Sequence, residues 1–505
     1  MRTNQQDIGP LILATHVCRS WRLIALDTAE LWAQMHSFRE DVFKAFVLRS
    51  REAPLKIHFT FNIYNEEAPP AKSIYTILMS QSHRIRDLTL HVDVSGYAFL
   101  QRLFAKGAPL LESLNLSFYV KSEELRTALV KARDTKTEEY HLDFPALRKL
   151  LLGVWAEKDA SSLRGLMNPS LRVLEFNAPQ AVQLSNAAWA SMLMELPLLE
   201  SLLLRNALLP ARSQPTLGQP PTSVIHLPKL KHLQISDSLP TEQTSLLQQI
   251  IPSHDVRIVF DSWSALPSPV VFPISQFLRI VNEKFVSQRQ NTSADYPIGL
   301  DLEVIEDMEY GIVRITLWTS LEESHYFGCP GYAAIDTKSA VFQLELQGFR
   351  YNMSRNALYQ LICDMLSRTF SLPKLKAFRL RTSDTVPAAC WDLFPQMIGL
   401  HALSIQPKYR HSDLIRILGI SKTPVSSAGT AGPLNSIPFP TLQVIILQEL
   451  YNDNINFELL CEVLRSRNDA GYPIRRIHIC PSKLQTDLRS RLSQLQSSLG
   501  FQCID

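Results

Sequence analysis

Short apolar segments recur along the chain in one order of positions, L-x-x-L-x-L, often with a proline two residues ahead. The last two apolar positions flank a single residue, which is the period-two pattern of a short β-strand with one buried face. The first apolar residue covers the turn before that strand. The pattern predicts a strand at each of these copies: IRDLTL (85–90), APLLESLNL (108–116), FPALRKLLL (144–152), NPSLRVLEF (168–176), LPLLESLLL (196–204), LPKLKHLQI (227–235), LPKLKAFRL (372–380), MIGLHALSI (397–405), FPTLQVIIL (439–447) and YPIRRIHI (472–479), with weaker copies IVRITL (312–317) and VFQLEL (341–346).

Segments with helical spacing lie between these copies, and several open on a Ser or Thr that can cap a helix. They begin at Ser122, Ser185, Thr241, Ser354 and Phe457. A repeated order of strand, turn and helix is typical of a leucine-rich repeat solenoid, in which each unit buries its face by stacking on its neighbours. We therefore expect an α/β fold, an irregular leucine-rich-repeat-like solenoid, with an α/β sandwich as the alternative.

The spacing of the copies is irregular, because the first apolar residues fall at positions 85, 111, 147, 171, 199 and 230. Residues 256–340 match the repeat least well and predict a degenerate segment. We expect residues 1–37 to form a separate helical segment and residues 38–505 to form the solenoid.

Composition and charge argue against several classes of function. The chain has 51 basic and 48 acidic residues, a balance that gives no argument for binding to nucleic acid or to an acidic membrane. Its seven cysteines contain no CxxC pair, which fits reduced thiols and excludes the usual zinc and disulfide patterns. The apolar run at residues 11–14 is too short for a membrane span. These features predict a cytoplasmic or nuclear protein.

Motifs typical of enzymes are missing from the sequence. It has no GxxxxGK[ST], GxSxG, HExxH or GxGxxG. Adjacent carboxylates such as Glu123-Glu124 and Glu322-Glu323 are usual on solvated surfaces. We expect no catalytic activity, no cofactor and no metal site.

The first helical segment differs from the rest of the chain. Residues 11–32 place Leu13, Val17, Trp21, Ile24 and Ala25 at helical spacing on one face, with Arg19 and Arg22 outside it. This pattern predicts a small amphipathic helix that docks on a partner. Replacing Trp21 by Ala is expected to cost about 3 to 5 kcal/mol if the ring is fully buried.

One part of this segment carries a family resemblance. The run Val17-Cys18-Arg19-Ser20-Trp21-Arg22, then Ile24-Ala25 and finally Leu31-Trp32, resembles the C-terminal half of the F-box, as seen in the large fungal family of F-box proteins with leucine-rich-like repeats. In that family the F-box docks on the Skp-type adaptor of a cullin-RING ubiquitin ligase, and the repeats hold a protein substrate. The resemblance therefore implies a substrate receptor.

The resemblance also assigns residues to the adaptor: Leu13, Val17, Cys18, Trp21, Arg22, Leu31 and Trp32. A family F-box begins with a Leu-Pro-x-Glu helix, and this chain has MRTNQQDIGP in that place. We therefore expect the N-terminal helix of the motif to be missing or truncated, with half of the usual docking surface absent.

A protein substrate would contact the strand positions that face away from the core. The row between the two inward positions is Thr89, Asn115, Leu151, Glu175, Leu203, Gln234, Thr316, Glu345, Arg379, Ser404, Ile446 and His478. The next outward row is His91, Ser117, Gly153, Asn177, Arg205, Ser236, Trp318, Gln347, Arg381, Gln406, Gln448 and Cys480. Because Arg and Trp are enriched at binding hot spots, we expect Trp318, Arg379 and Arg381 to contact a partner.

Three functions remain open. The chain is a ubiquitin-ligase substrate receptor, a leucine-rich-repeat interaction scaffold with no ligase role, or an unrecognised enzyme. Adaptor binding through residues 11–32 distinguishes the first from the second.

Overall fold

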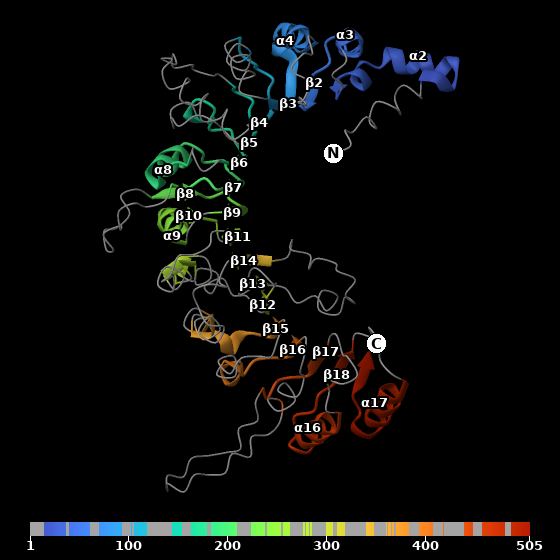
Figure 1. Ribbon diagram of the computed structural model, residues 1–505, viewed down its shortest axis with the longest axis vertical. Helices are drawn as coiled ribbons and strands as arrows, with labels where there is room; N and C mark the ends of the chain where they lie inside the picture. Colours follow the sequence, from blue (N-terminus) through green and yellow to red (C-terminus); the bar gives the residue numbers. More distant parts are fainter. Residues whose placement is uncertain are drawn as a thin grey trace. The chain divides into compact units, whose positions relative to one another are not determined.

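The computed structural model has a mixed α/β fold in two compact units, unit 1 (Met1–Ser238 and Gln248–Ser253) and unit 2 (Leu239–Leu247 and His254–Asp505). Each unit contains a large sheet in which most neighbouring strands are parallel (Figure 1). The structure describes residues 15–36, 40–60, 70–92, 103, 106–118, 144–153, 163–178, 183–209, 224–237, 240–253, 256–262, 276–277, 279–281, 283–284, 299–306, 311–318, 340–347, 360, 362–364, 366–367, 370–382, 393–407, 418, 439–447, 457–479 and 486–504.

The sheet of unit 1 follows the order of the sequence. Each strand pairs in parallel with the next one in this series: β1 (Gln34–Met35), β2 (Leu55–Thr60), β3 (Ile85–Val92), β4 (Ser113–Phe118), β5 (Lys149–Gly153), β6 (Val173–Asn177), β7 (Ser201–Arg205) and β9 (His232–Ser236). A separate parallel pair joins β8 (Ile225–Leu227) to β10 (Ile250–Pro252). The strands predicted between residues 85 and 235 are confirmed.

The buried face of this sheet consists of columns of apolar side chains in exact register across the strands. The two inner columns are Ile57, Leu88, Leu114, Leu150, Leu174, Leu202 and Leu233, and Phe59, Leu90, Leu116, Leu152, Phe176, Leu204 and Ile235. None of them is more than 2% exposed. Burial of each such side chain contributes about 1.5 to 3 kcal/mol, so the columns form the core of unit 1.

A tight turn leads into each of these strands from β4 onward. The amide of the first leucine, for example Leu147, donates to the carbonyl of the residue three positions earlier, Phe144, at 3.0 Å. Proline occupies the second position of this turn, as in Pro145 and Pro169, where its fixed φ angle suits the turn. The same turn precedes strands of unit 2, where Leu375 donates to Leu372 at 3.1 Å.

The helices of unit 1 are α2 (Arg19–Asp27), α3 (Glu40–Arg49), α4 (Pro70–Ser80) and α8 (Asn186–Met194), with the 3-10 turns η1 (Ala29–Trp32) and η2 (Ser82–Arg84). The Ser185 hydroxyl caps α8 by accepting from the Ala188 amide at 3.2 Å, as its sequence predicts. Figure 1 shows α8 to one side of the strands β6 and β7.

A buried arginine connects α3, the following loop and η2. The Arg84 guanidinium, 3% exposed, donates to the Gln81 amide oxygen at 2.6 Å, the Ala53 carbonyl at 2.9 Å and the Val47 carbonyl at 3.2 Å. Burial lowers the pKa of Arg84, opposed by the nearby charge of Glu52. The bond to Val47 gives a partner to one of the carbonyls in the last turn of α3, where the helix itself leaves carbonyls unpaired.

In unit 2, parallel pairs join β15 (Ala377–Thr382), β16 (Ala402–Pro407), β17 (Val444–Leu447), β18 (Arg476–Ile479) and β19 (Gln502–Ile504) in sequence order. Unit 2 also contains β11 (Arg257–Ser262), η7 (Leu372–Lys374), η8 (Phe394–Gln396), α16 (Phe457–Asp469), α17 (Thr486–Leu499) and most of α9 (Pro240–Gln249). The strands predicted between residues 376 and 479 are confirmed.

The middle of the sequence departs from the repeat. β12 (Gly299–Glu306) and β14 (Ala340–Gln347) both pair antiparallel with β13 (Gly311–Trp318), while β12 pairs in parallel with β15 and β14 with β11. The expectation that residues 312–317 form a copy of the parallel repeat is therefore wrong. A period-two pattern predicts a strand with one buried face, but it does not specify the direction of that strand.

Unit 2 also contains a turn in which only glycine fits. Gly399 takes the third position of the turn that precedes β16, and a Cβ built there would lie 2.3 Å from the Pro373 carbonyl oxygen. Contact at this distance is not possible, so the missing side chain lets two successive turns approach each other.

The predicted helices from Ser185, Thr241 and Phe457 correspond to α8, α9 and α16. The segment from Ser122 lies outside the described residues, and only part of the segment from Ser354 is described. Within the part of the chain that the structure describes, no helix has the length and apolar composition needed to span a membrane.

Candidate protein-binding surfaces

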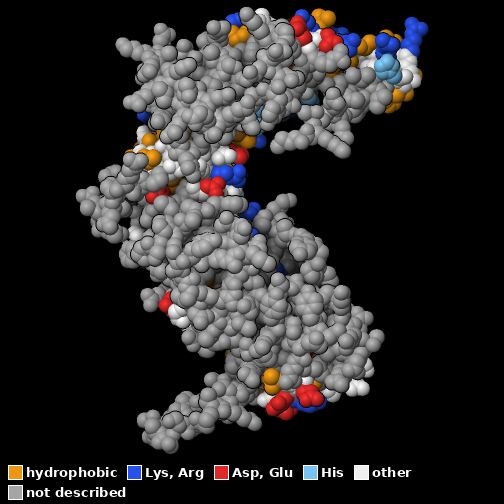
Figure 2. Space-filling model, in the orientation of Figure 1, with side chains coloured by type: hydrophobic (Ala, Val, Ile, Leu, Met, Phe, Trp, Pro, Cys, Tyr) orange, Lys and Arg blue, Asp and Glu red, His pale blue; other side chains and the backbone are white. Residues whose placement is uncertain are grey.

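The helix α2 exposes large apolar side chains. Val17, just before the helix, is 66% exposed, and Trp21, Leu23 and Ile24 are 58%, 59% and 65% exposed. We call these four residues the α2 surface. Figure 2 shows hydrophobic and basic side chains together at the end of unit 1 where Figure 1 places α2. Contiguous exposed apolar side chains are typical of interaction sites.

The start of α2 differs from the prediction. The backbone of Cys18 is extended, with φ −156° and ψ 170°, and its Sγ accepts from the Trp21 amide at 3.5 Å. Cys18 therefore caps the helix at Arg19, and Val17 belongs to the helical turn before it. The single continuous helix that we expected through Val17 and Trp21 is wrong.

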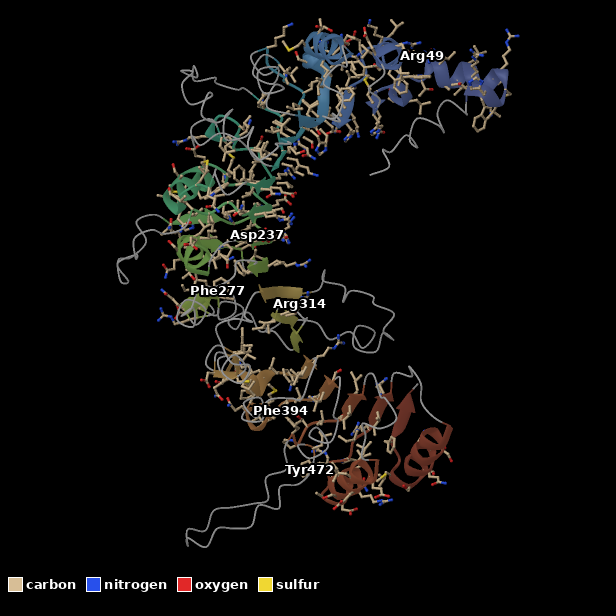
Figure 3. The ribbon with its side chains drawn as sticks, in the orientation of Figure 1. Arg49, Asp237, Phe277, Arg314, Phe394 and Tyr472 are labelled. Atoms are coloured by element: carbon tan, nitrogen blue, oxygen red, sulfur yellow. The ribbon has the colours of Figure 1, made fainter. Side chains whose placement is uncertain are left out.

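Trp32 holds the far end of α2 against unit 1. Its indole Nε1 donates to the carbonyl of Ala25, the buried residue of α2, at 2.6 Å. Its ring packs edge-on against Phe46 of α3 at 5.1 Å between centroids, and the Arg49 guanidinium lies 4.3 Å from its centre. Arg49, labelled in Figure 3, is the last residue of α3. With 1% of its surface exposed, Trp32 is a core residue that positions α2.

The residues that the resemblance assigns to the adaptor therefore fall into two groups. Val17, Cys18, Trp21, Arg22 and Leu31 are exposed, whereas Trp32 is buried, and Leu13 lies outside the described residues. Trp21 is not the buried ring for which a stability cost was expected. Leu23 belongs to the exposed set although it lies off the predicted helix face.

The outward face of the unit 1 sheet has the predicted register. Thr89, Asn115, Leu151, Glu175, Leu203 and Gln234 are direct neighbours across β3 to β9, and so are His91, Ser117, Gly153, Asn177, Arg205 and Ser236. Most of these side chains are partly exposed, and Ser236 is buried. β2 extends the first row with His58.

A row of charged residues lies at the start of these strands, within β3 for Arg86 and directly before the strand for the others. Arg86, Glu112, Arg148, Arg172, Glu200 and Lys231 are neighbours, because each amide from Glu112 onward donates to the carbonyl of the preceding member at 2.7 to 2.9 Å. We call this row the charge ladder. Arg86 pairs with Glu112 at 2.9 Å, and Glu200 pairs with both Arg172 at 3.3 Å and Lys231 at 2.9 Å. The sequence contains these charges at a fixed position of each repeat, but we did not predict the ladder.

The outward positions of unit 2 are different. Arg379 is 7% exposed, and Thr316, Ser404, Ile446 and His478 are also buried. The expectation that these positions are open to a partner is wrong for them. The side chains of Trp318 and Arg381 lie outside the described ones, so their predicted contacts stay predictions.

Apolar residues lie on this second face beside the buried polar ones. Ala377 and Ile446 form a small cluster with Ala402 and Val444, at the same parity as Arg379 and Ser404. Strands such as Val444-Ile445-Ile446-Leu447 are apolar at every position, which is typical of strands covered on both faces.

Two partly buried histidines lie on the outward face of unit 1. Burial lowers the pKa of His58, and the charge of His36, whose ring stacks on it at 5.0 Å, lowers it further; Asp87 acts in the opposite sense, and Lys56 adds a smaller lowering. Burial also lowers the pKa of His91, which hydrogen-bonds to the Ser117 hydroxyl. Both favour the neutral form in the folded chain.

Among the described residues, no three His, Cys, Asp or Glu side chains come close enough together to hold a metal ion. No protein-family model matches the chain, and a search of curated proteins finds no match either.

The two tryptophans are expected to differ in their effect on stability. Trp32→Ala removes a buried ring and should lower the free energy of unfolding by about 3 to 5 kcal/mol. Trp21→Ala removes an exposed ring and should change it by no more than about 0.5 kcal/mol. Urea unfolding of the two variants measures the difference, and equal destabilisation would contradict the assignment of Trp32 as the anchor.

The histidines predict a dependence of stability on pH. Because the folded pKa values of His58 and His91 lie below the ordinary value of 6.5, the unfolded chain binds more protons between the folded and unfolded values. Stability should therefore be full above pH 6.5 and fall as the pH drops below it. Melting temperatures across this range should fall less steeply for the His58→Gln, His91→Gln double variant; an unchanged slope would refute the assignment.

Proposed function

We propose that this chain is the substrate-recognition subunit of an SCF-type cullin-RING ubiquitin ligase. In this proposal the α2 surface docks on the Skp-type adaptor, and an outward face of the repeats holds a protein substrate. The chain acts as a receptor in the cytoplasm or nucleus and performs no catalysis.

The exposure of the α2 surface is the observation that carries the proposal. The four large apolar side chains of this surface, Val17 just before α2 and three within the helix, are each more than half exposed. Trp32 fixes the helix to the rest of unit 1. An apolar face presented on a tethered helix suits binding to another protein by helix packing. Arg19 and Arg22, both exposed, flank it with positive charge.

The repeated turn and strand support a leucine-rich-repeat-like solenoid as the finer description of the fold. Successive strands of unit 1 pair in sequence order, and each buries its apolar columns against its neighbours. The outward side chains take no part in this packing. They are therefore available for substrate recognition.

One observation favours the alternative, a leucine-rich-repeat scaffold with no ligase role. Trp32 and Phe46 place α2 and α3 at the first strands of unit 1, where a solenoid needs a cap for its first repeat. A cap and a docking helix are compatible, so adaptor binding decides between the two functions.

Adaptor binding is best tested with point substitutions, because deletion of residues 1–37 would also remove the core residues Trp32 and Met35. The purified chain should capture the Skp-type adaptor in a pull-down. Trp21→Ser combined with Ile24→Ser should weaken capture at least about tenfold, since two large apolar side chains are lost from a small interface.

The matched control is Ile398→Ser, which removes an apolar side chain 55% exposed in unit 2 and should leave capture unchanged. If the unsubstituted chain does not capture the adaptor, or if the double variant captures it equally well, the ligase function is refuted and the scaffold function is favoured.

A further inference from the structure

Two adjacent cations lie at the start of β5 without an acidic partner among the described residues. In the charge ladder, Arg86 pairs with Glu112, and Arg172 and Lys231 share the carboxylate of Glu200. Arg148 and Lys149, adjacent and both exposed, form no ion pair with any residue that the structure describes. Arg148 also has Arg172 as its ladder neighbour, so two like charges lie side by side there.

The next outward position of the same strands, two residues after Lys149 on β5, is apolar. Leu151 of β5 and Leu203 of β7 lie on either side of Glu175 of β6, and all three are partly exposed. Leucine is costly to leave in water at an outward position that the core does not use. Val173, next to Lys149 in register, extends this area toward the cations.

The next position on β5 is Gly153, where the face has no side chain. A Cβ built there would lie 3.0 Å from the Ser117 Cβ, so the glycine permits close packing of β4 and β5. Asn177 lies on its other side. Cations, a leucine and a position without a side chain therefore follow one another along β5.

We propose that this part of unit 1, the β5 surface (Arg148, Lys149, Leu151, Val173, Glu175 and Leu203), binds an extended acidic segment of a protein partner. Carboxylates of the segment pair with Arg148 and Lys149, and an apolar side chain of the segment covers Leu151 and Leu203. Glu175, between Leu151 and Leu203, repels any carboxylate of the bound segment that lies over these leucines. The acidic residues of the segment are therefore restricted to the start of the strands. The inference rests on the proposed function, because it names the substrate class of the receptor.

Fluorescence anisotropy of labelled synthetic peptides tests this proposal on the full chain without the adaptor. Three short peptides serve as probes: one with a leucine flanked by Asp and Glu, one with the leucine flanked by Lys and Arg, and one acidic peptide with Ser in place of the leucine. The first should bind at least about tenfold more tightly than either of the others, and salt should weaken it.

Arg148→Glu combined with Lys149→Glu should reverse the preference, so that the acidic peptide loses at least about tenfold in affinity and the basic peptide gains. The control, Arg465→Glu combined with Arg475→Glu, makes the same charge change at two exposed positions of unit 2 and should keep the preference of the unsubstituted chain. Absence of acidic peptide binding, or a preference that survives reversal at Arg148 and Lys149, would overturn the proposal.

A pull-down with the Skp-type adaptor separates this inference from the proposed function. The reversal at Arg148 and Lys149 should leave adaptor capture unchanged, because these residues lie on β5 and not on α2. Peptide binding without adaptor capture would refute the ligase function and keep the β5 surface, whereas adaptor capture without peptide binding would refute the β5 surface alone.

Discussion

Stacking of apolar columns between neighbouring repeats is the constraint on which the rest of the structure depends. A single strand such as β5 can bury Leu150 and Leu152 only because β4 and β6 place Leu114, Leu116, Leu174 and Phe176 beside them in register. The turn before each strand fixes where the first leucine enters the core, and Pro145 or Pro169 restricts the conformation of that turn. Because this packing uses one face of the sheet, it leaves the composition of the other face open.

The two candidate surfaces arise from this division in different ways. On the outward face, the spacing of the strands turns single residues of each repeat into rows, so that Lys149, Leu151 and Leu203 share one surface without any special local structure. Arg148 directly precedes Lys149 at the start of β5. The α2 surface depends on one anchor instead. Trp32 connects the Ala25 carbonyl to Phe46 and Arg49, and this contact lets the opposite side of the helix remain exposed.

Much of unit 1 could be predicted from the sequence, since each repeat buries the same three positions and local spacing determines both the strand and its register. Local pattern does not determine strand direction, which explains the failure at β13, where Ile315 and Leu317 are buried as expected but in an antiparallel strand. Local pattern also does not distinguish the exposed Trp21 from the buried Trp32. Both are tryptophans in helical segments, and only the tertiary contacts with Phe46 and Arg49 bury one of them.

In unit 2, positions such as Arg379, Ser404 and His478 were predicted to be exposed because each lies between the two inward apolar positions of its strand. The signal that could have corrected this was the apolar residue at the same parity in each strand, Ala377, Ala402 and Val444, which indicates a sheet covered on both faces. The charge ladder of unit 1 was equally present in the sequence. Each of its members directly follows the first apolar residue of its repeat, but the hydrogen bonds between successive repeats are what make these residues neighbours.

Hydrogen–deuterium exchange of the full chain, with and without the Skp-type adaptor, tests the central claim that a stacked core presents a tethered and unpartnered helix. In the chain alone, amides of β4 to β7 should exchange slowly and those of α2 faster, because Ala25 is the buried residue of that helix. Adding the adaptor should slow exchange in α2 and leave β4 to β7 unchanged. Slow exchange in α2 before the adaptor is added, or protection that appears in the strands instead of the helix, would contradict the account.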